Sequence, residues 1–158
     1  MSDLNINIIP MGEYVLEKVQ PDNIDHYKAI KKLRDYTAKK QAFDLKYQLD
    51  LMKQNKSVGN NYLITDVKHY LGFLYVSPLD NGERVLSIII NRRLRNKGLG
   101  TIIIDSISNY LLDYDYAAVL RMNINKDNEA SIKMASKCGY VKESETEQTF
   151  CFKKVRNV

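Results

Sequence analysis

Apolar residues are densest in the middle of the chain, where two kinds of spacing follow each other. Five of the six residues in Val85–Ile90 are aliphatic, and a run of this length is typical of a buried strand. A basic, polar turn comes next. Beyond it, apolar residues recur every four positions, at Leu99, Ile103, Ile107 and Leu111. This spacing predicts a helix with one apolar face, which begins at two glycines and ends near Asp113.

Upstream of this central strand, alternating and helical patterns predict further strands and two helices. Pro10 and Gly12 are expected to end the first, short edge strand, and the pair Asn81-Gly82 is typical of a hairpin turn that leads into the central strand. The predicted elements are an edge strand over Leu4–Ile8, a strand over Tyr14–Val19, a helix from Asp22 or Asn23 to about Lys40, a helix from about Asp44 to Asn55, and strands over Tyr62–Thr65 and His69–Val76.

Downstream of the central helix, a strand, a capped helix and two closing strands are expected. Leu120, Met122 and Ile124 alternate with polar residues and should share one face of the strand. An Asn- and Asp-rich segment then gives a helix-start signal, and Gly139 is a plausible left-handed residue after the helix. The predicted elements are a strand over Ala117–Ile124, a helix that starts within Asn125–Ser131 with Asn or Asp as the cap and runs through Ile132, Ala135 and Cys138, and strands over Tyr140–Glu143 and Gln148–Val155.

The order of these elements predicts a single domain over residues 1–158 of the α+β (or α/β) class. The hairpin at Asn81-Gly82 is antiparallel, whereas the helix that connects the central strand to Ala117–Ile124 makes that pair parallel. The prediction is therefore a mixed, largely antiparallel sheet of about six to seven strands, flanked by four helices.

Composition narrows the class of protein. The chain has 158 residues, 44% hydrophobic and 27% charged, which is typical of a soluble globular domain. The net charge of +5 fits a ligand with several phosphates and also weak contact with nucleic acid, although no dense basic block is present. Two cysteines, Cys138 and Cys151, suit buried or half-buried thiols better than disulfides or zinc. The N-terminus does not resemble a signal peptide and no run is long enough for a membrane span, so a cytoplasmic location is expected.

The glycine turn before the central helix has the features of an anion cradle. The first N–H groups of a helix have no partner within the helix and carry partial positive charge. Arg92, Arg93, Arg95 and Lys97 add positive charge around the turn. A Walker motif is excluded because Lys97 precedes Gly98, and a Rossmann motif is excluded because Ile103 stands where a third glycine is required.

What remains is the pattern R-x-x-G-x-G at Arg95, Gly98 and Gly100, which resembles the pyrophosphate loop of the GNAT superfamily of N-acetyltransferases. A second segment resembles the other signature of that family, which has Asn, a small residue three positions on, Lys nine positions on, and Gly followed by an aromatic residue. The matching residues are Asn128, Ser131, Lys137, Gly139 and Tyr140. Both motifs occur in the family's order, with a strand between them, and the resemblance spans about Tyr14 to Phe152.

The resemblance implies an acetyl-coenzyme A cosubstrate, no metal, and a sheet that opens between the central strand and the next. The backbone of Ile88, Ile89 and Ile90 would bind the pantetheine arm, and Asn128 and Ser131 would approach the pantetheine or the acceptor. Arg92, Arg93 or Lys97 would reach the 3′-phosphate. The pyrophosphate would be held by the turn residues Arg95, Asn96, Lys97, Gly98, Leu99, Gly100 and Thr101.

Acyl transfer to an amine needs a group that removes a proton from the amine and a donor for the leaving thiolate. Many family members carry a tyrosine donor seven residues after the Asn, but this chain has Ala135 there, which looks more like the branch that acetylates N-terminal amines, including those of ribosomal proteins. Ser131, Ser136 or a water would then serve. Glu83 and His69 are the base candidates, although each is more often structural. The catalytic candidates are therefore Glu83 and Ser136.

The leading interpretation is an N-acetyltransferase whose partner is an amine-bearing small molecule or a protein acceptor. The alternatives are a catalytically weak acyl-coenzyme A sensor, suggested by Ala135, and a small basic nucleic-acid-binding domain. Specificity for the acceptor should lie in Asp22–Asn55 and in the last hairpin, which hold no recognisable motif. We expect no nucleic-acid or membrane partner, and either a monomer or a homodimer.

Overall fold

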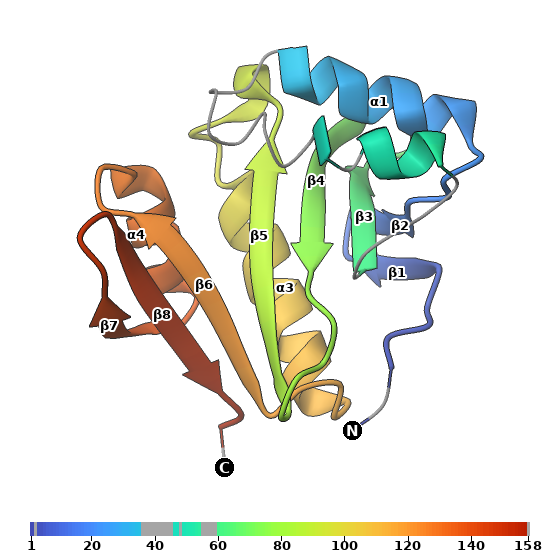
Figure 1. Ribbon diagram of the computed structural model, residues 1–158. Coiled ribbons are helices and arrows are strands. Elements are labelled where there is room, and N and C mark those ends of the chain that lie inside the picture. The colour runs from blue at the N-terminus through green and yellow to red at the C-terminus, as the bar shows by residue number, and fades with distance from the viewer. Residues whose placement is uncertain (2, 36–45, 48, 55–59, 158) are drawn as a thin grey trace. The chain divides into compact units, whose positions relative to one another are not determined.

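The computed structural model describes residues 1, 3–35, 46–47, 49–54 and 60–157 (Figure 1). Residues 46–47 and 49–53 are helical and belong to the second predicted helix, whose other residues lie outside the described ones. The named elements are β1 (Ile8–Met11), β2 (Tyr14–Lys18), α1 (Ile24–Asp35), β3 (Asn60–Thr65), β4 (Tyr70–Val76), β5 (Glu83–Ile90), the 3-10 helix η1 (Arg92–Leu94), α3 (Leu99–Asp113), β6 (Val119–Asn125), α4 (Glu129–Lys137), β7 (Val141–Glu145) and β8 (Thr149–Val155).

The predicted fold class is confirmed. Among the described residues the sheet has eight strands in the order β1-β2-β3-β4-β5-β6-β8-β7, slightly more than predicted. The β5–β6 pair is parallel, as the helical connection requires, whereas β1–β2, β2–β3, β6–β8 and β7–β8 are antiparallel. The Asn81-Gly82 turn is also confirmed: both residues have positive φ, 51° and 77°, and the flanking Asp80 and Glu83 exchange backbone hydrogen bonds.

The predicted edge strand over Leu4–Ile8 is wrong in position, because the first strand runs from Ile8 to Met11 and contains Pro10. Pro10 is tolerated there because β1 is the end strand of the sheet, where a missing N–H interrupts no second ladder. Leu4 does not belong to a strand, but its side chain is buried, with 1% exposed, which accounts for an apolar residue at this position.

The described chain divides into two compact units. The first consists of Met1–Leu4, Val76–Ser87 and Asn96–Val158, and the second of Asn5–Tyr75 and Ile88–Arg95. The prediction of one domain over residues 1–158 stays a prediction.

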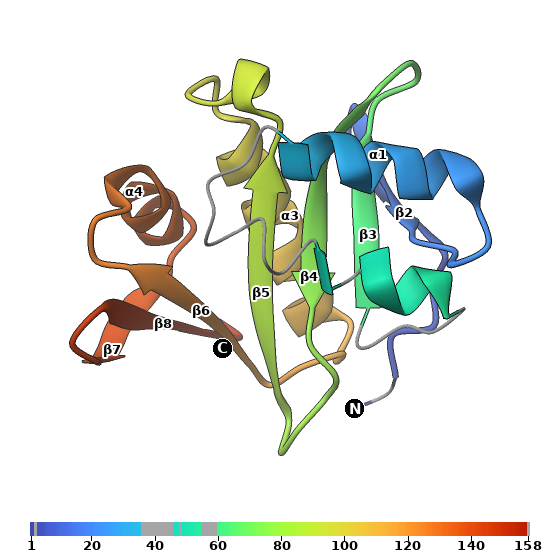
Figure 2. The ribbon, with the colours of Figure 1, turned by 45° about the horizontal axis from the view of Figure 1, so that its top comes forward.

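In the second unit, α1 lies across strands β3 and β4 (Figure 2). Asn23 caps this helix, as one of the two predicted caps, because its Oδ1 accepts hydrogen bonds from the N–H groups of Asp25 and His26. The buried face of α1 includes His26 and excludes Ile24, which is 62% exposed. The core cluster consists of Ile30, Leu33, Leu49, Met52, Leu63, Phe73 and Ile89.

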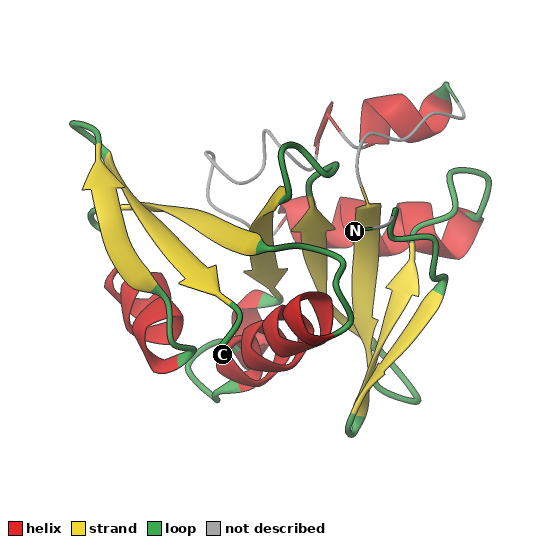
Figure 3. Cartoon of the chain, turned by 90° about the horizontal axis from the view of Figure 1, so that it is seen from below, coloured by secondary structure: helices red, strands yellow, loops and turns green. Residues whose placement is uncertain are grey.

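In the first unit, α3 and α4 pack against each other and against β6, on one face of the strands (Figure 3). The predicted stripe of α3 is confirmed, since Leu99, Ile103, Ile107 and Leu111 are all buried. The alternation in β6 is confirmed as well, with Leu120, Met122 and Ile124 buried and the two residues between them more exposed. These helices therefore owe their place to the apolar stripes read from the sequence.

The parallel ladder between β5 and β6 is short. It joins Glu83–Val85 to Val119–Arg121. Leu86 and Ser87, the last β5 residues of this unit, lie beyond the ladder. Strand β6, by contrast, pairs with β8 along its whole length, from Val119 to Asn125. The opening of the sheet between the central strand and the next stays a prediction.

The stripe of α3 allows a matched stability test. Ile107→Ala removes a side chain with no exposed surface, and we expect the free energy of unfolding to fall by about 2–5 kcal/mol. Ile102→Ala makes the same chemical change on the same helix at a side chain that is 46% exposed, and we expect a loss of about 1 kcal/mol or less. Urea unfolding followed by circular dichroism measures both. Equal losses would show that the stripe does not face the core.

Candidate functional site

The stretch between β5 and α3 is held in shape by local hydrogen bonds. The side chain of Asn91 caps η1 by accepting a hydrogen bond from Arg93 N at 3.1 Å. Arg95 folds back, and its Nε donates to the carbonyl oxygen of Ile90 at 3.1 Å. The chain therefore turns away from the strand in a defined conformation before it reaches the two glycines.

At the glycine turn, Asn96 and Gly98 have positive φ, 63° and 82°. Gly98 is the N-cap residue of α3, and no side chain caps the helix there. The first helical bond runs from Ile102 N to Gly98 O, so the N–H groups of Leu99, Gly100 and Thr101 have no partner within the helix. These amides carry the positive end of the dipole of a 15-residue helix.

Space is open in front of this turn. A Cβ atom added to Gly98 would meet no other atom within 4 Å, and Asn96, Lys97 and Gly98 are exposed. The turn is therefore not packed shut. Arg92, Arg93, Arg95 and Lys97 are exposed as well. Unpartnered helix amides, open space and cationic side chains together can bind a phosphate or diphosphate group.

The second motif has clear structural roles in α4. Asn128 caps the helix, since its Oδ1 accepts a hydrogen bond from Ser131 N at 3.2 Å, which leaves Nδ2 available as a donor. Gly139 ends the helix at φ 83°, as predicted. Tyr140 is buried, and its hydroxyl group lies 2.7 Å from Ser108 Oγ. Burial raises the pKa of Tyr140 well above its ordinary value, so the phenol stays protonated.

Ala135 occupies the expected position of the tyrosine donor, and Ser136 follows it. Ala135 has no exposed surface. Ser136 is exposed, and its carbonyl oxygen accepts a hydrogen bond from Gly139 N. Cys138 is buried and its pKa is raised to about 11, mainly by burial, so it is an unreactive thiol at neutral pH. The burial of Cys138 and the half-burial of Cys151 agree with the predicted state of both thiols.

Glu83 is engaged in an ion-pair network. Its two carboxylate oxygens accept hydrogen bonds from Arg121, at 2.9 Å from Nε and 3.2 Å from NH2. Arg121 also pairs with Glu143, and Lys153 Nζ lies 3.6 Å from Glu143 Oε1. The hydrogen bonds from Arg121 lower the pKa of Glu83. Glu83 is also the first residue of β5, and Ile88, where the pantetheine arm is expected, is five residues or about 16 Å further along the extended strand. These contacts favour a structural role for Glu83 over that of a base.

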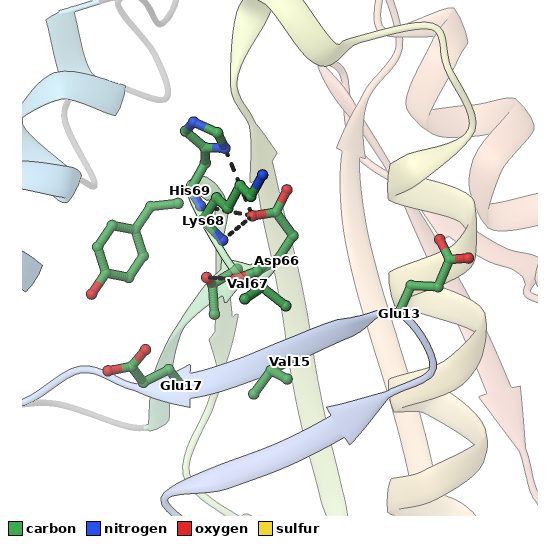
Figure 4. Close-up of a pocket in the computed structure, with 9 residues that line it drawn as sticks. Glu13, Val15, Glu17, Asp66, Val67, Lys68 and His69 are labelled. Atoms are coloured by element: carbon green, nitrogen blue, oxygen red, sulfur yellow. Dashed lines mark hydrogen bonds and ion pairs between the residues drawn. The ribbon is translucent and has the colours of Figure 1, made fainter.

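His69 lies just before β4, at the end of the β3–β4 turn. Its side chain is 72% exposed, and Nδ1 lies 3.8 Å from Asp66 Oδ1. The same Asp66 oxygen accepts hydrogen bonds from the N–H groups of Lys68 and His69, each at 2.7 Å, and these bonds lower the pKa of Asp66 (Figure 4). Asp66 therefore shapes the turn and stays ionised at neutral pH.

A cavity of about 360 Å³ adjoins this turn, and we call it the β2 cavity. Its lining comes from β2 with its preceding turn and from the β3–β4 connection: Glu13, Val15, Glu17, Thr65, Asp66, Val67, Lys68, His69 and Tyr70 (Figure 4). Of these residues, sequence reasoning singled out only His69. His26 is the residue that could have pointed to the cavity. It stands four residues before Ile30 and seven before Leu33, a spacing that places it on the same face of α1, and it contacts Glu17.

No group of three or more His, Cys, Asp or Glu side chains is arranged to hold a metal ion in the part of the chain that the structure describes. Among the same residues, no helix is both long and apolar enough to cross a membrane.

Comparisons with known proteins agree with both motifs. A model of the Acetyltransferase (GNAT) family matches residues 27–140. One similar structure is a GNAT-family acetyltransferase from Bacillus anthracis, with a TM-score of 0.75 and 11% identity over 94% of this chain and 98% of that one. Another is the ribosomal-protein alpha-N-acetyltransferase RimL in complex with coenzyme A, with a TM-score of 0.73 and 12% identity over 94% and 97%.

A third similar structure is the N-acetyltransferase PseH from Campylobacter jejuni in complex with acetyl coenzyme A, with a TM-score of 0.70 and 15% identity over 91% and 99%. No curated protein matches the chain. At these identities the similar structures show a shared fold, and it covers nearly the whole of each chain.

The Arg121 network gives a pH-dependent prediction. Because Arg121 lowers the pKa values of Glu83 and Glu143 below their ordinary 4.5, the network stabilises the fold above that pH and loses its effect as pH falls through the lowered values. We expect Arg121→Met to lower the urea midpoint at pH 7 and to approach the wild type between about pH 5 and pH 3. Arg93→Met, at an exposed side chain, should leave the midpoint unchanged. A difference that is independent of pH would contradict the network.

Proposed function

We propose that this chain, which belongs to the Acetyltransferase (GNAT) family, moves an acetyl group from acetyl-coenzyme A directly to a primary amine. The observation that carries the proposal is the glycine turn at the start of α3, where no side chain caps the first amides and the space beside Gly98 is open. That geometry suits the diphosphate of coenzyme A, and four cationic residues, Arg92, Arg93, Arg95 and Lys97, stand within six positions before Gly98. When bound, the cofactor supplies an acetyl thioester.

The residues at the turn fit the diphosphate in two ways. Gly98 has no side chain in the open space where phosphate oxygens would lie, and the amides of Leu99, Gly100 and Thr101 are available as donors. The exposed Arg92, Arg93 or Lys97 would contact the 3′-phosphate. Asn96 would contribute its backbone N–H group, whereas that of Arg95, expected to do the same, already donates to Arg92 O at 3.4 Å.

The end of β5 would hold the pantetheine arm. Ile88 and Ile90 are half-buried, and their backbone would donate to and accept from the amides of the arm. Strand β4 supports this segment closely: Asn91 N donates to Leu71 O at 2.8 Å, and a Cβ atom added to Gly72 would lie only 2.5 Å from Ile89 O. On α4, the Nδ2 of Asn128 would donate to the pantetheine or the acceptor, with Ser131 beside it.

The acceptor of the acetyl group is an amine of a small molecule or of a protein. Among similar structures are a spermidine N-acetyltransferase chimera and RimL, which acetylates a ribosomal protein, so the fold serves both kinds of amine. The attacking amine has to be neutral, and its proton goes to a base or through water to solvent. Glu83 stays a weak candidate for that base because the hydrogen bonds from Arg121 lower its pKa and engage both carboxylate oxygens.

The leaving thiolate needs little assistance in this chain. A thiol with a pKa near 8.5 is a tolerable leaving group at neutral pH, so water or the exposed Ser136 hydroxyl would suffice as donor.

One observation favours a second candidate function, a catalytically weak acyl-coenzyme A sensor. Ala135 is fully buried and the hydroxyl group of Tyr140 is engaged with Ser108, so α4 presents no tyrosine donor.

Two glycines form a matched pair for a binding test. Gly98→Glu places a carboxylate in the proposed diphosphate site and should abolish acetyl-coenzyme A binding in isothermal titration, with wild-type binding at micromolar levels. Gly12→Glu imposes the same substitution at a positive φ of 66° with open space around it, and binding should stay within about twofold. No binding by the wild type, or equal loss in both variants, would contradict the site.

A thiol-release assay separates the enzyme from the sensor. We expect turnover of acetyl-coenzyme A with at least one member of a panel of diamines, aminoglycosides and peptides with free N-terminal amines. Ser136→Ala should lower kcat without changing KM if its hydroxyl group protonates the thiolate, and should leave both unchanged if water does so. Binding without turnover on any amine would favour the sensor.

A further inference from the structure

We propose that the β2 cavity binds a small organic cation through an ammonium group, with the Glu17 carboxylate as the counter-charge. The inference concerns only residues of the second unit and does not depend on acyl transfer. At about 360 Å³ the cavity lies at the lower end of the range of small-molecule sites, about 300–1,000 Å³.

Glu17 is held in place by a buried histidine. His26, only 1% exposed, accepts a hydrogen bond from Gln20 N at Nδ1 and therefore donates from Nε2 to Glu17 Oε1, at 2.8 Å. The backbone amide thus selects the histidine tautomer, and the histidine orients the carboxylate. Glu17 itself is 32% exposed and lines the cavity. A carboxylate fixed from behind by a buried donor is pre-organised to receive a ligand in front.

The charge of the cavity is negative, although the chain as a whole is at +5. Its walls carry three carboxylates, Glu13, Glu17 and Asp66, against a single Lys68. Asp66 is largely satisfied within its own turn, by two backbone N–H groups, His69 and Lys68. Glu17 accepts its hydrogen bond from the neutral donor of a histidine, and Glu13 is exposed, so these two are the charges left for a ligand.

The remaining walls suit an organic cation better than a metal ion. Val15, Val67 and the ring of Tyr70 give the cavity apolar surface, and the Tyr70 ring also packs edge-on against His26. Burial, followed by the charge of Glu17, raises the pKa of Tyr70, so its hydroxyl group stays a neutral donor and acceptor. No metal-binding group is found among the described residues. An ammonium group with a short alkyl chain uses both the carboxylate and the apolar walls.

The test uses butylammonium chloride with the whole chain, followed by two-dimensional amide NMR at constant ionic strength. We expect saturable shifts of the Lys68, His69 and Tyr70 amides, and no saturable shifts with 1-butanol or sodium butyrate. Glu17→Gln keeps an oxygen for the His26 donor but removes the charge, and should weaken binding at least tenfold. Glu147→Gln, an exposed carboxylate in the other unit, should leave the affinity unchanged.

Val67 provides a second pair of variants that do not risk the fold, because its side chain is 97% exposed. Val67→Lys should weaken butylammonium binding and Val67→Glu should strengthen it, since the substituted charge lies in the wall of the cavity. The proposal is overturned if the shifts do not saturate, if 1-butanol binds as well as butylammonium, or if both Val67 variants bind with wild-type affinity.

Discussion

The unsatisfied amides at the start of α3 are the constraint on which the proposed chemistry rests. A helix of 15 residues whose apolar stripe is buried cannot shift or unwind cheaply, so its first N–H groups are held at one place. Gly98 takes a left-handed conformation there and adds no side chain that could cap the helix or fill the space ahead of it. The same packing that stabilises the unit therefore holds in place the amides that would bind the diphosphate.

Electrostatics divides the charged side chains of this protein into two groups. Those of Glu83, Arg121, Glu143 and Lys153 form a network of ion pairs that joins the β5, β6, β7 and β8 strands and engages both carboxylate oxygens of Glu83. The cations at the glycine turn, and Glu17 in the β2 cavity, are held without a paired charge of opposite sign in the contacts described above. Unbalanced charge next to open space is where a ligand of opposite sign gains most, so these places carry the functional proposals.

Several motif residues serve the fold as well as the proposed function. Asn128 uses its carbonyl oxygen to cap α4 and keeps its amide nitrogen for a ligand, while Gly139 and Tyr140 end the helix and fill the core. A motif of this kind is recognisable in a sequence because a backbone requirement and a ligand requirement coincide. Glu83 illustrates the opposite case: its residue type suits catalysis, but its partner, 38 positions away, engages it elsewhere.

The sequence by itself determined the elements whose signal is local. The α3 stripe, the Asn81-Gly82 turn, the caps of α1 and α4 and the glycine turn all depend on residues within a few positions of one another, and the structure agrees with them. Only the tertiary structure decided which polar residues are buried and with whom. His26 was expected on no particular face, yet it lies behind Glu17, and Pro10 sits inside a strand because that strand is at the sheet edge. Such partners lie on different elements and are set by how the chain folds, so the spacing within one helix or strand does not encode them.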